Sequence, residues 1–222
     1  MRLVSVIVLF GALTVACSSH AEAPPPVDAD LGSYALDALS RTVAATGPMR
    51  CPAVPRGSFT GEGVRWKTPL SVHPAFAERL ARFEAVVVEV ATQVYGRAPK
   101  RMAHLGSYNC RRIRLYPDLL SEHGIANAVD LSAFEFDALP RGADAPDELP
   151  KALRRAFRVT VLDHWTPKRD DAVSRLHRRF LVELTDRLVA RGDIFRVLLG
   201  PAYPGHKDHF HFDCAPYRLV VL

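Results

Sequence analysis

The sequence predicts an α+β domain in which a mainly antiparallel sheet is flanked by two long helices. Two stretches, residues 74–95 and 170–191, carry apolar side chains at helical spacing. Between and after them lie short segments that alternate in polarity or are rich in β-branched residues. Their spacing is typical of hairpins rather than of strand–helix–strand units, which favours antiparallel pairing.

The first 17 residues are predicted to be a lipoprotein-type signal segment. One Arg precedes an apolar run that ends at Cys17, with a small residue directly before this Cys. Such a pattern resembles a bacterial lipobox, in which cleavage leaves a lipid-modified Cys17 as a membrane anchor. The alternative is a plain secretory leader cleaved near Ala21 or Ala23. Both interpretations predict an exported protein.

Residues 18–57 are predicted to form a tether and a short N-terminal helix, and residues 58–222 to form the domain. Three consecutive prolines at 24–26 indicate an extended tether, whereas the apolar spacing over residues 31–45 permits a helix. The serines at 18 and 19 resemble those of lipoproteins sorted to the outer membrane. We therefore expect a cell-envelope lipoprotein on the periplasmic face.

The elements of the domain are predicted in chain order. The first helix has Pro74 in its first turn and ends before Gly96. The alternation over residues 127–136 places Asp130, Ser132 and Phe134 on one side of a strand. The second helix places His177 on a charged face. Further strands are predicted at 101–108, 157–162, 195–199 and 208–213.

The composition limits the class of protein and the partners that can be expected. A hydrophobic content of 48% is ordinary for a globular protein with a core. The formal net charge of +5 suits an anionic cell-envelope polymer, but the Lys and Arg residues are scattered and form no basic stripe. We therefore expect no nucleic-acid partner.

Three cysteines remain when Cys17 is set aside: Cys51, Cys110 and Cys214. An exported protein with three such thiols is expected to form one disulfide and keep one spare cysteine. Cys110 lies between the other two and is the expected member of the pair. The partner of Cys110 cannot be read from the sequence.

Histidines and acids form the chemical signature of the chain. His206, His209 and His211 lie within six residues, and His123 and Asp130 lie seven apart. If the last segment is a strand, His209 and His211 project from the same face. Two imidazoles and one carboxylate, with a fourth position left to water, are typical of a hydrolytic zinc site. The spacing by itself leaves exposed, non-ligating histidines as the alternative.

Five motifs carry a family resemblance. They are Tyr108-Asn-Cys110-Arg111-Arg112, Ser121-Glu-His123, Ala128-Val-Asp130, Leu199-Gly-Pro201 and His206-Lys-Asp-His209-Phe-His211-Phe-Asp213. From about residue 65 to 215 the chain resembles the bacterial extensin-like C-terminal family. This family is related to the D-Ala-D-Ala metallopeptidase, lysostaphin and hedgehog superfamily, whose zinc fold the resemblance implies.

The resemblance implies a zinc hydrolase of peptidoglycan stem or cross-bridge peptides, of endopeptidase or D,D-carboxypeptidase type. It implies His123, Asp130 and His211 as the Zn²⁺ ligands. His209 is implied as the catalytic base or transition-state hydrogen-bond donor, with Asp208 as the alternative and His206 in support. Cysteines usual in the family near residues 72–73 and 192 are absent, so its disulfide pairing cannot be carried over.

Four further residues have open roles. Arg111 or Arg112 is expected to bind a substrate carboxylate, with a structural ion pair as the alternative. Asp213 is expected to orient a ligand imidazole or to cap the strand end. Ser121 is expected to hydrogen-bond a ligand or to cap a turn. The competing function is a non-catalytic, zinc-containing module that binds the cell wall.

Overall fold

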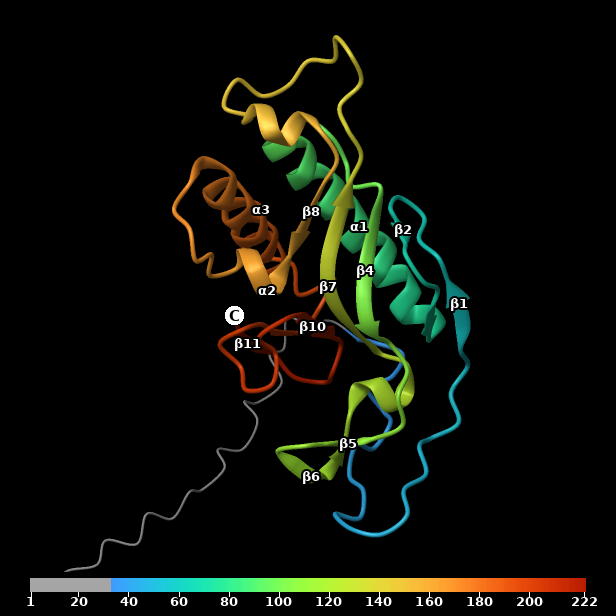
Figure 1. The fold of residues 1–222 in the computed structure, drawn as a ribbon. Helices are drawn as coiled ribbons and strands as arrows, with labels where there is room; N and C mark the ends of the chain where they lie inside the picture. Colours follow the sequence, from blue (N-terminus) through green and yellow to red (C-terminus); the bar gives the residue numbers. More distant parts are fainter. Residues whose placement is uncertain (1–32) are drawn as a thin grey trace, which may run out of the picture.

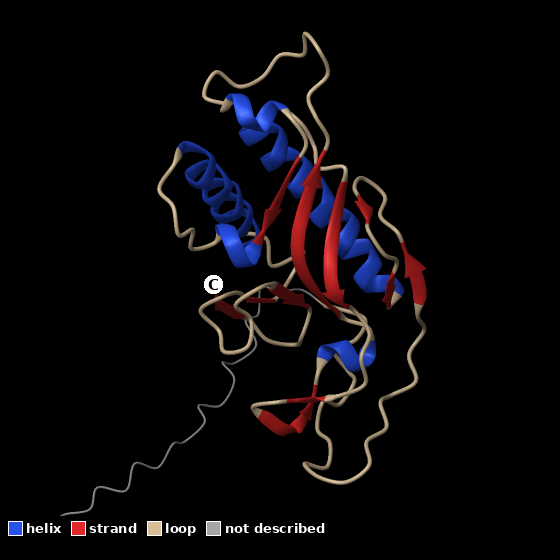
Figure 2. Cartoon of the chain, in the orientation of Figure 1, coloured by secondary structure: helices blue, strands red, loops and turns tan. Residues whose placement is uncertain are grey.

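A mixed, seven-stranded sheet forms the centre of the fold (Figure 1, Figure 2). The structure is a computed structural model that describes residues 33–222. The predicted signal segment, the lipidation site Cys17 and the three prolines at 24–26 of the tether lie outside the described residues.

Local capping fixes both long helices close to their predicted bounds. Helix α1 spans Pro74–Tyr95, where the His73 ring accepts a hydrogen bond from the Ala75 amide and Gly96 ends the helix at φ 71°. Helix α3 spans Ala172–Val189 and is capped by the Asp171 side chain. The short helices are α2 (Val161–His164), η2 (Glu122–Ile125) and η3 (Lys151–Arg154). No helix in the described part is long and apolar enough to cross a membrane.

The central sheet has the strand order β11-β9-β10-β7-β4-β2, and β8 pairs with β7. Its strands are β2 (Arg65–Trp66), β4 (Arg101–Gly106), β7 (Ala128–Phe136), β8 (Phe157–Thr160), β9 (Val197–Leu199), β10 (Phe210–Asp213) and β11 (Leu219–Val221). The prediction of a mainly antiparallel sheet is corrected to a mixed one, because β2 and β11, the strands at the two ends of this order, pair in parallel. Between β2 and β4 the chain passes through α1, a crossover connection that permits parallel pairing.

Two small sheets lie beside the central one, and the sequence analysis did not anticipate them. One pairs β1 (Gly57–Phe59) with β3 (Leu70–Val72), and the other pairs β5 (Arg112–Ile113) with β6 (Tyr116–Leu120). Strands of two to five residues are too short to produce a clear alternating pattern. The β5–β6 hairpin lies at the end of the molecule that carries η2 (Figure 1).

The core lies between one face of the sheet and the two long helices, which pack side by side (Figure 2). Phe83 of α1 meets Phe212 of β10 with ring centroids 5.8 Å apart. Phe180 of α3 meets Phe134 of β7 at 4.9 Å. The opposite face of the sheet is therefore free to carry polar side chains.

A β-bulge corrects the predicted faces of β7. Ala103 of β4 pairs with Ala133, but the next residue, His104, pairs with Leu131, so Ser132 is an extra residue in β7. An extra residue reverses the alternation that follows it. Phe134 is fully buried in the core, whereas Asp130 points away from it. The prediction that Asp130 and Phe134 share a face is therefore wrong.

The predicted short helix over residues 31–45 does not form in its described part. Residues 35–38 form a turn, and Thr42 makes an isolated bridge to Leu119. The Asp37 carboxylate accepts the Tyr34 amide, and Arg41 donates to the carbonyls of Leu36 and Leu39. These side chains satisfy backbone groups that a helix would otherwise pair.

Four predicted strands are shorter than expected, and β4 and β9 each lack two of the predicted residues. The strand predicted over residues 157–162 ends at Thr160, whose hydroxyl accepts the Asp163 amide and begins α2. The strand predicted over residues 208–213 begins only at Phe210. His209 therefore precedes the strand that carries His211.

Candidate metal centre

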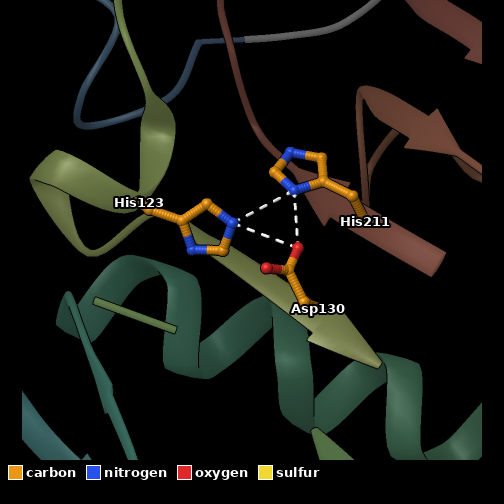
Figure 3. Close-up of side chains that lie close together, drawn as sticks. All are labelled: His123, Asp130 and His211. Atoms are coloured by element: carbon orange, nitrogen blue, oxygen red, sulfur yellow. Dashed lines mark hydrogen bonds and ion pairs between the residues drawn. The ribbon is translucent and has the colours of Figure 1, made fainter. Parts of the chain in front are cut away.

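Two histidines and one aspartate from separate segments meet on the polar face of the sheet (Figure 3). His123 Nε2 lies 3.1 Å from Asp130 Oδ1 and 3.2 Å from His211 Nδ1. His211 Nδ1 lies 2.9 Å from the same Asp130 oxygen. Among the described residues, this is the group of His, Cys, Asp and Glu side chains whose atoms could hold a metal ion.

Strand register places two of the three residues. β10 pairs antiparallel with β7, and His211 lies directly opposite Asp130. Residues directly opposite one another project from the same face of a sheet. His123 comes from η2, which reverses the chain before β7 and ends at Ala126 in the left-handed conformation, with φ 56°.

In each of the two imidazoles, the nitrogen that faces away from Asp130, here called the outer nitrogen, is hydrogen-bonded to another part of the protein. His123 Nδ1 lies 2.7 Å from the Ser107 carbonyl oxygen and donates to it. His211 Nε2 lies 2.7 Å from Asp213 Oδ2 and donates to it. A proton on each outer nitrogen leaves the inner nitrogens, His123 Nε2 and His211 Nδ1, as lone-pair donors that face Asp130.

A cation or a shared proton must separate these donor atoms. Burial by itself lowers the pKa of His211, but hydrogen bonds to Asp130 and Asp213 outweigh burial and raise the pKa to about 9 in the metal-free protein. Burial by itself raises the pKa of Asp130, but hydrogen bonds from His123 and His211 hold it well below its usual range. Two neutral imidazole nitrogens and an ionised carboxylate fit the ligand preference of Zn²⁺.

His209 stands next to this cluster. Its Nε2 lies 3.7 Å from Asp130 Oδ1, and its Nδ1 lies 2.9 Å from Asp208 Oδ1. The contact with Asp208 fixes the orientation of the ring. It also favours a proton on Nδ1, which leaves the lone pair on Nε2. His209 is therefore close enough to act on a molecule bound at the cluster.

His206 completes the group of histidines. Its ring centroid lies 4.8 Å from that of His209 and 5.7 Å from that of His211, and its Nδ1 donates to the Pro204 carbonyl. Burial, together with the charge on His211, lowers the pKa of His206 to about 4. His206 is thus a neutral neighbour of the other two rings at neutral pH.

A sequence model of the family described as Extensin-like protein C-terminus matches residues 29–220. The chain belongs to this family. The match begins well before residue 65, where the resemblance was expected to start, and so includes residues 34–51 of the predicted tether and helix segment. No curated protein and no solved structure matches the chain.

The predicted substrate-binding arginines of this family member have different surroundings. Arg112 donates to the backbone carbonyls of Ala44, Thr46 and Gly47 at 2.7–3.0 Å. Its guanidinium is thus occupied by the N-terminal segment. Arg111 is exposed, and its backbone carbonyl accepts the Ser121 amide.

The other two predicted residues lie next to the ligands. Asp213 contacts His211 and also accepts the Ala215 amide at 2.8 Å, so it both orients the imidazole and caps the strand end. Ser121 is buried at the start of η2, where its side chain makes no capping hydrogen bond.

Two residues at the site escaped the sequence analysis. Ser107 contributes a backbone carbonyl, which any residue type could supply, so no sequence signal marks it. Glu122 is buried beside His123 and binds Arg41, which is 81 residues away in the chain. A charged residue directly next to a candidate ligand was the available signal for Glu122.

One disulfide joins Cys51 and Cys110, with their Cα atoms 5.8 Å apart, and Cys214 is a buried free thiol. The prediction of one disulfide that includes Cys110 is confirmed.

Proposed function

We propose that this protein is an exported, zinc-dependent hydrolase of peptidoglycan peptides, related in fold to the D-Ala-D-Ala metallopeptidase, lysostaphin and hedgehog-type zinc peptidases. The observation that carries the proposal is the convergence of His123 Nε2, Asp130 Oδ1 and His211 Nδ1. The other nitrogen of each imidazole is hydrogen-bonded to the protein. Family membership alone does not specify a reaction.

These three atoms would hold the Zn²⁺ ion. A zinc ion held by three protein ligands polarises a substrate carbonyl and lowers the pKa of water to about 7, which makes a nucleophile available at neutral pH. Asp213 and the Ser107 carbonyl keep both ligand rings in the required tautomer. These contacts would orient the ligand atoms before an ion binds.

His209 is the proposed general base. Its Nε2 faces the cluster, 3.7 Å from Asp130 Oδ1. The Asp208 carboxylate would stabilise the imidazolium that forms when Nε2 accepts a proton. The same proton can then pass from Nε2 to the leaving amine. His206 packs beside His209 without adding a second positive charge.

Other parts of the chain support the proposed substrate class and location. The basic balance of +5 suits the anionic cell wall, and exposed Arg111 is the proposed contact for a substrate carboxylate. Lipidation at Cys17 would hold the protein on the periplasmic face of the outer membrane, within reach of murein.

Digestion of murein sacculi by the zinc-loaded protein tests the proposal. We expect muropeptide fragments, identified by mass, from the wild type. The His209→Ala variant should release fragments about 10²–10⁴-fold more slowly, since this is the usual contribution of a general base. It should still bind one equivalent of zinc.

His164→Ala serves as the matched control, because it removes a histidine outside the cluster. Release at the wild-type rate is expected from this variant. A wild-type protein that binds zinc and sacculi but releases no fragment would contradict the proposed hydrolysis. That outcome would instead support a non-catalytic wall-binding module.

A further inference from the structure

The segment from Tyr34 to Cys51, here called the N-terminal strap, crosses the turn that carries His123. This turn is short: η2 spans four residues, from Glu122 to Ile125. His211 and Asp130, in contrast, sit on paired strands, where ladder hydrogen bonds fix their backbone. His123 therefore needs support from outside its own element.

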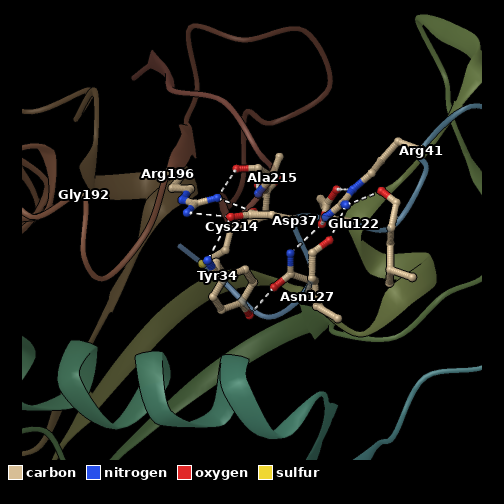
Figure 4. A network of polar contacts seen from close by, with 12 residues as sticks. Tyr34, Asp37, Arg41, Glu122, Asn127, Gly192, Arg196, Cys214 and Ala215 are labelled. Carbon is tan, nitrogen blue, oxygen red and sulfur yellow. Dashed lines mark hydrogen bonds and ion pairs between the residues drawn. The ribbon is translucent and has the colours of Figure 1, made fainter. Parts of the chain in front are cut away.

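Arg41 of the strap binds the residue directly before His123. Its Nε lies 2.7 Å from Glu122 Oε1, and its Nη2 lies 3.2 Å from Oε2 (Figure 4). The remaining Nη1 donates to the carbonyls of Leu36 and Leu39 at 2.5 and 2.6 Å, which fixes the guanidinium within the strap. A two-point contact of this kind sets the orientation as well as the distance.

Tyr34 of the strap reaches the other end of the same turn. Its hydroxyl donates to Asn127 Oδ1 at 2.7 Å, and Asn127 Nδ2 donates to Glu122 Oε2 at 2.5 Å (Figure 4). Glu122 is the first residue of the turn and Asn127 follows it, and both are buried. The strap thus holds the turn before and after His123.

The disulfide attaches the end of the strap beside His123. A Cβ placed on Gly124 would lie 2.8 Å from Cys51 Sγ, so the sulfur packs directly against the residue that follows His123. Cys110, the other half of the disulfide, follows Asn109, whose amide donates to the His123 carbonyl at 3.1 Å. The same segment provides the Ser107 carbonyl that binds the His123 ring.

We propose that the N-terminal strap is a positioning element of the metal centre, in which Arg41 and the Cys51–Cys110 disulfide hold His123 in the ligating position. The inference rests on the proposed metal site but not on hydrolysis. Ligand side chains must be held within about 0.5 Å of the productive geometry, and four residues of η2 offer few contacts that could do so. The match to the family from residue 29 includes the strap.

Zinc affinity, measured by competition with a chromophoric chelator, tests the strap. The variants are Arg41→Met and the double variant Cys51→Ser/Cys110→Ser, each compared with the wild type at a temperature where circular dichroism shows a folded protein. We expect zinc affinity to fall about 10–100-fold, as is typical when residues that support metal ligands are changed. Arg41→Lys should restore only part of it, because an ammonium lacks the two-point contact.

Arg187→Met is the matched control, since Arg187 lies on α3 and binds Glu89 and Gln93 of α1. Its zinc affinity should equal that of the wild type. Tyr34→Phe, which removes a single hydroxyl, provides a milder strap variant if Arg41→Met does not fold. It should weaken zinc binding by less than the double cysteine variant.

The visible spectrum of the Co²⁺-substituted protein separates positioning from general stabilisation. The strap variants should change the d–d bands, because the His123 ligand shifts, whereas a loss of stability alone leaves the spectrum unchanged. Wild-type affinity and spectrum in the folded strap variants would overturn the inference, even if sacculi are digested. Zinc binding that depends on the strap in a protein that digests no sacculi would support the inference and contradict the hydrolysis. A wild type without zinc would overturn both.

Discussion

Two of the histidine pairs in the described residues, His123 with His211 and His164 with His177, have opposite surroundings. The rings of His123 and His211 have centroids 5.0 Å apart, and those of His164 and His177 have centroids 4.6 Å apart. The first pair faces carboxylates. The second pair lies between α2 and α3, where His177 binds the hydroxyl of Tyr95 at 2.9 Å and stacks on an aromatic ring of the core.

The two environments move the histidine pKa in opposite directions. Carboxylate hydrogen bonds overcome burial and raise the pKa of His211 to about 9, whereas burial, with a further contribution from His164, lowers that of His177 to about 4. Proximity of two imidazoles is thus not sufficient for a cation site. The difference is the half-buried carboxylate of Asp130, which lies against the facing nitrogens of the first pair.

Removal of a ligand should have the largest effect on metal binding. Asp130→Ala and His211→Ala each delete one of three donor atoms, so the zinc content measured by inductively coupled plasma mass spectrometry should fall from about one ion per chain to background. Removal of a histidine from the other pair, in His164→Ala, should leave the zinc content unchanged. Stoichiometric zinc in either ligand variant would mean that the ligand assignment is wrong.

A change at the supporting carboxylate should have an intermediate effect. Asp213→Asn keeps the shape and the oxygen that accepts the Ala215 amide, but it removes the negative charge behind His211. Zinc affinity should fall about 10–100-fold. Asp171→Asn, at the exposed cap of α3, is the control and should bind zinc as the wild type does. Equal affinities in the two variants would show that the carboxylate behind His211 is unimportant.

Changes in the second pair should alter stability and leave zinc affinity untouched. The folded pKa of His177 lies near 4, below its ordinary value of 6.5. Between these values the unfolded chain binds a proton that the folded chain excludes, so this stabilisation is present above pH 6.5 and is lost as pH falls toward 4. His177→Phe removes this proton uptake while keeping an aromatic ring.

Urea unfolding at pH 7 and pH 5 measures this effect. The loss of unfolding free energy between the two pH values should be smaller in His177→Phe than in the wild type by about 2 kcal/mol. The subtraction between proteins removes the contribution of other titrating groups. An identical loss in both proteins would show that His177 is not held neutral by the fold.

His177 also shows where sequence patterns fail. The sequence placed it on a charged face of the helix, yet the residue is 3% exposed. The helix itself was predicted well, because apolar spacing and the Asp171 cap are local. Whether one position of a helix is covered depends on which aromatic side chains arrive from β8 and α1, and these are distant in sequence.

In the strands and the candidate site, too, some features were recognisable from the sequence and others were not. The segment 128–136 was recognisable as a strand, but the bulge at Ser132, which turns Asp130 away from the core, arises from pairing with β4. His123, Asp130 and His211 were identifiable by residue type and motif. Their support by Ser107 and by the strap was not, since it uses a backbone carbonyl and contacts across 81 and 93 residues.

The sequence by itself determined the two long helices, most of the strands of the central sheet and the residue types capable of binding a metal. These properties follow from side-chain chemistry and from hydrogen bonds between residues close together in the chain. Only the tertiary structure decided that β2 and β11 pair in parallel, that Cys51 joins Cys110, and that three donor atoms meet within about 3 Å. Register, bulges and long-range contacts set these distances, because each is selected by the packing of the whole chain rather than by any single segment.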